Sequence, residues 1–212
     1  NIYLIIKEFL KTINTLLLLI LLGCASIKDM AKQTAPLLNG QKVDKALLTK
    51  DINNNDITIG SILSKKPTVL VFYRGGWCPY CNIQLANLRK ITKEIEALGY
   101  QLVAVSPDKV LNLKKSIDKK KLSYQLIADS NLVLASSFGV SFKLDNKTLL
   151  AYKTYGINLE EASGKKHHSL PIPSVYVIDT DGLIHFNYVN PNYKVRLNEK
   201  ILLSALKELK LK

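Results

Sequence analysis

Cys78 and Cys81 are the residues whose types and spacing point most clearly to chemistry. They follow an apolar run over 68–73 and two glycines, and they open a long amphipathic stretch. A cysteine at the start of a helix meets unpaired N–H groups and the positive end of the helix dipole, and both favour the thiolate. Pro79 suits the first helical position because its ring lacks an N–H. The spacing therefore predicts a redox pair, with Cys78 as nucleophile and Cys81 one turn later as the second thiol.

Two other uses of a Cys-x-x-Cys spacing stay open at this point. The first is half of a zinc site, since this spacing is common among zinc ligands. The chain has three cysteines, however, and Cys24 lies in a very different context. His167 and His168 are adjacent and so poorly placed to complete one site. The second is an inert structural disulfide. The strand, turn and helix context favours redox chemistry over both, and we predict no metal and no cofactor.

The elements that position this pair follow from apolar periodicity. Strands alternate with helices at a spacing typical of a largely parallel sheet covered on both faces. An Asp-Gly pair at 181–182 marks an antiparallel hairpin near the end. A second hairpin is expected within 34–66, and an insertion with one helical turn near 149–155 is expected within 141–170. The predicted strands are 68–73, 101–105, 124–128, 175–178 and 183–188, and the predicted helices are 82–98, 106–117, 131–138 and 198–209.

The first residues resemble a bacterial lipoprotein signal. Lys7 and Lys11 precede an apolar run over 16–22, which is too short to span a bilayer as a helix. The run leads into Gly23-Cys24, as in a lipobox, where the cysteine is acylated. We expect a signal peptide at 1–24, a linker at 25–34 and one domain at 35–212, anchored to the membrane through Cys24 in the cell envelope of a bacterium. An ordinary cleaved signal or an uncleaved anchor is the alternative.

Composition agrees with one soluble domain behind this leader. The chain has 212 residues, of which 47% are hydrophobic, and its formal net charge is +13. Lysines carry almost all of the positive charge and are scattered among acidic and apolar residues. Because they do not gather with aromatic residues into a stripe, we predict a solvated lysine surface and no nucleic-acid partner.

Four segments together resemble one family. They are FYRGGWCPYC at 72–81, SPD at 106–108, LPIPSVYVIDTDG at 170–182 and YVNPNYKVRL at 188–197. They are similar to the alkyl hydroperoxide reductase/thiol-specific antioxidant (peroxiredoxin-like) family. The resemblance implies an α/β thioredoxin fold, with a central mixed sheet, helices on both faces, an N-terminal extension and a peroxiredoxin-type insertion. It also makes Pro173, after Ile172, the counterpart of a cis-proline that packs beside the redox pair.

The same resemblance implies an activity. The Cys78 thiolate would attack a hydroperoxide, Cys81 would condense with the resulting sulfenic acid, and a thioredoxin-like dithiol would reduce the disulfide. The alternative is an envelope oxidoreductase that acts on protein disulfides without peroxidase activity. A redox-inactive scaffold that merely keeps the fold is a third.

One departure from the family bears on the choice. Its members place Pro-x-x-x-Thr-x-x-Cys around the peroxide-attacking cysteine, but Gly75 stands at the threonine position and the proline is missing. Arg74 and Arg196 are the candidates for positive charge beside the sulfur. His167 and His168 are expected in a solvated loop, with the mouth of the site as the alternative. The supporting residues that we predict around the pair are Arg74, Trp77, Pro79, Tyr80, Ile172 and Pro173.

Overall fold

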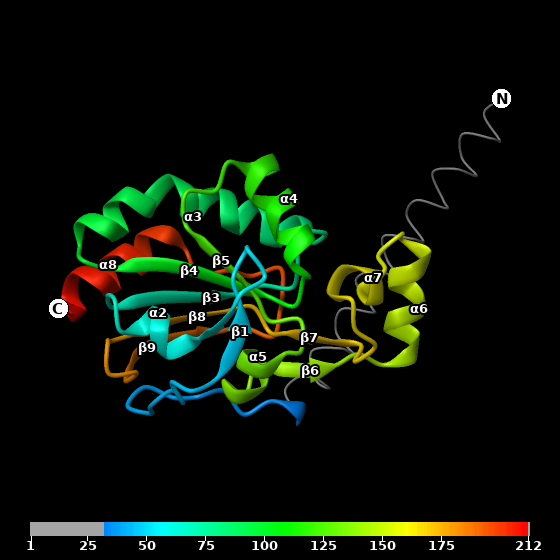
Figure 1. Ribbon diagram of the computed structural model, residues 1–212, viewed down its shortest axis with the longest axis horizontal. Helices are drawn as coiled ribbons and strands as arrows, with labels where there is room; N and C mark the ends of the chain where they lie inside the picture. Colours follow the sequence, from blue (N-terminus) through cyan, green and yellow to red (C-terminus); the bar gives the residue numbers. More distant parts are fainter. Residues whose placement is uncertain (1–31, 212) are drawn as a thin grey trace, which may run out of the picture.

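The computed structural model describes residues 32–211, and its centre is one seven-stranded mixed sheet (Figure 1). The strand order is β2-β1-β5-β4-β3-β8-β9. β3, β4 and β5 run parallel, whereas β8 and β9 add antiparallel strands on one side and β1 and β2 on the other. The strands are β1 (Leu48–Lys50), β2 (Asp56–Thr58), β3 (Thr68–Phe72), β4 (Gln101–Ser106), β5 (Gln125–Ala128), β8 (Ser174–Ile178) and β9 (Ile184–Val189).

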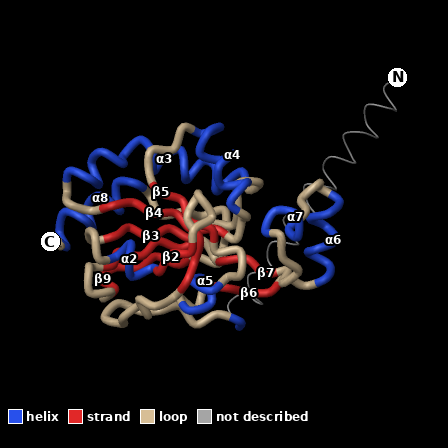
Figure 2. The backbone as a smooth tube through the Cα atoms, viewed as in Figure 1, coloured by secondary structure: helices blue, strands red, loops and turns tan. Residues whose placement is uncertain are grey.

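Helices cover both faces of this sheet (Figure 2). One face packs against α3 (Pro79–Ala97), α4 (Val110–Lys120) and α8 (Glu199–Leu209), and the other against α2 (Ile59–Leu63) and α5 (Val133–Ser137). Alternate residues of the central strands point to opposite faces, so β3 sends Val69 and Val71 to the first core and Leu70 and Phe72 to the second. Two apolar cores therefore hold the central strands rigidly from both sides.

A small lobe projects beyond one end of the sheet (Figure 1). It contains a two-stranded antiparallel sheet, and its helices pack outside the main layers. No residue of α6 is fully buried, but Leu149 and Tyr152 are partly buried against the core and face it from one side of the helix. The lobe comprises β6 (Ser141–Lys143), α6 (Asn146–Thr154), α7 (Leu159–Ser163) and β7 (Ser169–Pro171).

The predicted fold class is confirmed, with local differences. The hairpin within 34–66 forms as β1 and β2, and the insertion contains two helices and a hairpin instead of one turn. α4 begins at Val110 rather than at 106, because Asp108 turns inward toward another loop. The predicted signal segment, Cys24 and most of the linker lie outside the described residues. Within 32–211, none of the helices has the length and apolarity needed to cross a membrane.

Candidate active site

Four chain segments meet at one edge of the sheet because of its topology. β3 and β4 are parallel and pair Phe72 with Val105, so both end at this edge. β8 is antiparallel to β3 and begins there, since Ser174 pairs with Phe72. β9 is antiparallel to β8 and ends there, with Val189 opposite Ser174. The loops after β3, β4 and β9 and the residues before β8 are therefore neighbours.

The loop after β3 delivers the cysteine pair. Cys78 is the N-cap of α3 and Pro79 takes one of the first helical positions, as predicted. Both cysteines are free thiols, and Cys81 lies one turn inside the helix. Cys78 is 1% exposed and Cys81 is fully buried. Cys78 is buried because its side chain joins the apolar core between α3 and the sheet.

The two sulfurs have opposite acidities. A hydrogen bond from the Cys81 side chain, the charge of Arg74 and the Cys81 backbone N–H lower the pKa of Cys78 to about 6, although burial opposes them. Burial and the neighbouring Cys78 raise the pKa of Cys81 well above its ordinary value. The depressed pKa predicted for Cys78 agrees with this, but its largest cause is the second thiol rather than the helix amides. These pKa shifts favour a Cys78 thiolate at neutral pH that accepts a hydrogen bond from a protonated Cys81.

Arg74 is buried directly behind the pair, at the end of β3. Its guanidinium carbon lies 4.1 Å from the ring centre of Tyr193 and 5.1 Å from that of Trp77. One terminal nitrogen donates to the hydroxyl of Tyr152, while the buried Nε has no hydrogen-bond partner. Burial lowers the pKa of Arg74, and the two cysteines act in the opposite direction. The aromatic rings thus hold a desolvated positive charge that acts on the sulfurs.

Gly75 and Asp108 fix the loop between Arg74 and Cys78. Gly75 has φ +142°, and a Cβ there would lie 2.8 Å from Oδ1 of Asp108 and would also clash with the Trp77 indole. Oδ2 of Asp108 accepts a hydrogen bond from the backbone N–H of Gly76 at 2.7 Å. Burial raises the pKa of Asp108 to about 6. A threonine cannot occupy position 75 in this loop, which explains the departure from the family pattern.

Arg196 reaches the pair from the segment that follows β9. One terminal nitrogen donates to Sγ of Cys81 at 3.4 Å, and the other donates to Oε1 of Gln84 at 3.0 Å. Both predicted arginines therefore lie at the site, and they come from different loops.

Ile172 and Pro173 complete the wall of the site before β8. Pro173 lines a cavity of about 20 Å³ together with Arg74 and Tyr193. A space of about 10–15 Å³ holds one water molecule, so this cavity admits only a very small ligand. The predicted cis bond before Pro173 was wrong: residues 32–211 contain no cis peptide. The chain runs extended here, since the N–H of Ile172 bonds the carbonyl of Val140 and Ser174 already pairs with β3.

Tyr80 and Trp77 border the site through aromatic contacts. Tyr80 is 37% exposed and meets the edge of Tyr193 at 5.8 Å between ring centres. Trp77 meets Tyr152 of α6 at the same separation. Sequence reasoning missed four residues that the fold brings here. The YVNPNYKVRL and SPD segments carried a signal for two of them, but nothing marked the others. The missed residues are Gln84, Asp108, Tyr152 and Tyr193.

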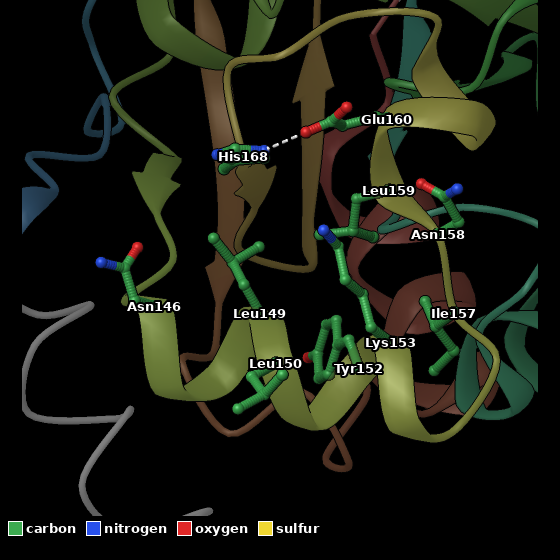
Figure 3. A pocket seen from close by; sticks show the side chains of 10 residues that line it. All are labelled: Asn146, Leu149, Leu150, Tyr152, Lys153, Ile157, Asn158, Leu159, Glu160 and His168. Atoms are coloured by element: carbon green, nitrogen blue, oxygen red, sulfur yellow. Dashed lines mark hydrogen bonds and ion pairs between the residues drawn. The ribbon is translucent and has the colours of Figure 1, made fainter.

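Of the two histidines, His168 lines a cavity in the lobe (Figure 3). Nε2 of His168 is 2.6 Å from Oε1 of Glu160, beside a cavity of about 270 Å³ between α6 and α7. Nε2 of His167 bonds the carbonyl of Ser130. Across the described part of the chain, no cluster of His, Cys, Asp and Glu residues is arranged to hold a metal ion.

Comparison with known sequences identifies a family and several relatives. The model of the AhpC/TSA family matches residues 33–187. Peroxiredoxin Bcp of Escherichia coli K12 is 27% identical over 141 residues, which cover 66% of this chain and 78% of the relative. A bcp-type relative from Haemophilus influenzae is 33% identical over 75 residues, or 35% of this chain. That match spans about half of the relative's length, 48%.

Solved structures give the same fold. Peroxidoxin BcpB from Mycobacterium tuberculosis superposes with a TM-score of 0.62 at 20% identity, covering 81% of this chain and 97% of the other. Peroxiredoxin Q of Xanthomonas campestris superposes with a TM-score of 0.61 at 17% identity, covering 84% of this chain and 99% of the other. At these identities the superpositions establish the architecture alone.

Proposed function

The chain belongs to the AhpC/TSA family, and we propose that it is a peroxiredoxin-like peroxidase that reduces small hydroperoxides through Cys78 and Cys81. The relatives' names support this class of reaction. The observation that carries the proposal is the setting of Cys78. It is a thiolate at neutral pH, it is 1% exposed, and the buried guanidinium of Arg74 acts on it.

The first step consumes the peroxide. The Cys78 sulfur bonds to the terminal oxygen, the O–O bond breaks, and an alkoxide or hydroxide leaves and takes a proton from water. Negative charge moves from the sulfur to the departing oxygen, so a nearby guanidinium stabilises the transition state. Arg74 supplies this charge. The hydroxyl of Tyr152, bonded to Arg74, replaces the family's threonine as the polar group beside the peroxide.

The second step regenerates the thiols. Cys81 condenses with the Cys78 sulfenic acid to form a disulfide and water, and a thioredoxin-like dithiol then reduces that disulfide. Because both sulfurs are buried, the surroundings of Cys78 must open before the partner can attack. We expect oxidation by peroxide to be faster than reduction by the dithiol.

Reduction of protein disulfides is the second candidate. The Cys-x-x-Cys pair at a helix N-terminus supports it, since this arrangement suits thiol–disulfide exchange. A protein disulfide must approach the attacking sulfur along a straight line, so it reaches Cys78, which is 1% exposed, only after the site opens, whereas a small hydroperoxide needs less room. Burial therefore favours a small hydroperoxide.

Purified protein separates the candidates. Consumption of hydrogen peroxide coupled to thioredoxin oxidation supports the peroxidase. Reduction of insulin without peroxide turnover contradicts it and supports the oxidoreductase, and the absence of both supports a redox-inactive scaffold.

We also propose that the protein is a lipoprotein of the bacterial cell envelope, anchored through Cys24. The Leu21-Leu22-Gly23-Cys24 segment supports this. Mass spectrometry of the membrane fraction tests it: an acylated Cys24 at the mature N-terminus is expected, and an unmodified Cys24 contradicts the proposal.

A further inference from the structure

Arg196 binds the second sulfur of the pair rather than the first. Its Nη2 donates to Sγ of Cys81 at 3.4 Å. Its Nη1 donates to Gln84, which lies one helical turn beyond Cys81 on α3 and is 6% exposed. The next residue, Leu197, is buried in the core between α3, α8 and the sheet. The Arg196 side chain is therefore held at its tip by the hydrogen bond to Gln84 and at its base by the buried backbone next to Leu197.

We propose that Arg196 is a catalytic residue for disulfide formation, stabilising negative charge on the Cys81 sulfur while that sulfur attacks Cys78. This inference rests on the proposed function. In the step, the Cys81 sulfur bonds to the sulfur of the Cys78 sulfenic acid and the S–O bond breaks. The Cys81 thiol proton leaves with the hydroxyl group as water, so atoms and electrons balance.

The need for such a group follows from the burial of Cys81. Its side chain is fully buried, so water cannot solvate a developing thiolate. An unpaired charge in an apolar core is costly, and a hydrogen bond from a cation is among the strongest compensations. Burial and Cys78 both raise the pKa of Cys81, whereas Arg196 acts to lower it.

The other ionisable groups around Cys81 do not replace Arg196. The guanidinium of Arg74 already donates a hydrogen bond to Tyr152 and packs over the ring of Tyr193. Asp108 and Tyr73 are acidic groups, and neither provides positive charge. The ionisable groups that face Cys81 are Cys78 on its own helix, Tyr73 and Arg74 after β3, Asp108 after β4, and Arg196 after β9.

Gln84 acts as a positioning residue in this arrangement. Its Oε1 accepts one edge of the guanidinium and so aims the other edge at the sulfur. Gln84→Leu keeps a side chain of similar size but removes the acceptor. We expect it to weaken the effect of Arg196 without deleting the charge.

The test separates the two chemical steps by rapid mixing with hydrogen peroxide. Among the groups that lower the pKa of Cys78, Arg196 has the smallest effect, so Arg196→Met should slow formation of the Cys78 sulfenic acid much less than it slows disulfide formation, which should fall by roughly 10- to 100-fold. The sulfenic acid then accumulates and is trapped by dimedone. Arg196→Lys keeps a cation and should lose less, and Gln84→Leu should fall between wild type and Arg196→Met. Arg89→Met is the control. It removes an exposed arginine of α3, the helix that carries Cys81 and Gln84, and it should change neither step.

A second oxidant makes the outcome independent of peroxide. Diamide adds to the Cys78 thiolate, and the Cys81 sulfur then displaces the hydrazine, so the same S–S bond forms. If wild type ignores peroxide but reacts with diamide, the proposed function fails while the role of Arg196 is still measured. If Arg196→Met forms the disulfide at the wild-type rate with both oxidants, the inference is overturned. If Arg196→Met forms it more slowly and Arg196→Lys regains part of that rate, the inference is supported.

Discussion

Cys78 and Cys81 lie one helical turn apart, yet their surroundings shift the pKa values of the two thiols in opposite directions. Cys78 caps the helix, accepts a hydrogen bond from the other thiol and feels Arg74, so its pKa falls to about 6. Cys81 lies deeper, and burial keeps it protonated. Arg74 has the larger effect of the two arginines on Cys78, and Arg196 donates a hydrogen bond to Cys81. The same residue type thus takes opposite pKa shifts within one helical turn, and under the proposed function this difference makes Cys78 the sulfur that reacts first.

The strongest way to break this comparison is to remove each sulfur in turn. Cys78→Ser is expected to abolish peroxide consumption, because no thiolate remains at the helix N-terminus. Cys81→Ser should still consume one equivalent of peroxide per protein and then stop as a sulfenic acid. Peroxide assays over one turnover, followed by mass spectrometry, measure both results. Activity in Cys78→Ser at the wild-type level would reverse the assignment of the two sulfurs.

The next largest effect is expected from Arg74. Arg74→Met removes the buried charge next to Cys78, so the rate of sulfenic acid formation should fall by roughly 100-fold. The pKa of Cys78 should rise in the same variant, because Arg74 is one of the groups that lower it. Stopped-flow measurement of peroxide oxidation from pH 5 to 9 provides both numbers. Arg89→Met again serves as the matched control, and an equal loss in that variant would remove the specific role of Arg74.

A smaller effect is expected from Asp108, which lies against the loop of Gly75 and Gly76. Its folded pKa of about 6 is raised above the ordinary 3.8, so its contribution to stability is fully present below about pH 4 and is lost as the pH rises through 6. Asp108→Asn should remove this loss, because an amide oxygen can still accept the Gly76 N–H. The free energy of unfolding of wild type relative to Asp108→Asn should fall by about 2–3 kcal/mol between pH 4 and pH 7.

Urea unfolding at the two pH values measures this difference. Asp129, whose pKa burial raises to about 7, is present in both proteins and cancels in the comparison. A constant difference between wild type and Asp108→Asn over this range would show that Asp108 is not held as a buried acid.

The sequence predicted the structure correctly wherever neighbouring residues alone determine it. The passage from β3 into α3, with Cys78 as N-cap and Pro79 after it, follows from neighbouring residues, and so do the main strands and the last helix. The insertion was underestimated because α6 has no fully buried residue and only Leu149 and Tyr152 pack against the core, so its apolar periodicity is weak. β6 and β7 have three residues each, too few to show alternation.

The rest of the site depends on contacts between distant positions. Arg74 and Tyr152 are separated by 78 positions, and Arg196 and Cys81 by 115. No pattern in one sequence states that these side chains meet. They meet because β3 and β4 end, and β8 begins, at the edge where β9 ends. Asp108 was assigned to a helix start for the same reason: its partner, the Gly76 N–H, lies in a loop that only the parallel pairing of β3 and β4 brings near.

Titration of the reduced protein by thiolate absorbance near 240 nm tests the central claim most directly. One thiolate should form with a midpoint near pH 6, and the second should not appear until well above pH 9. The first step should be absent in Cys78→Ser. Two thiols that titrate together near pH 8.5, as free cysteines do, would contradict the account.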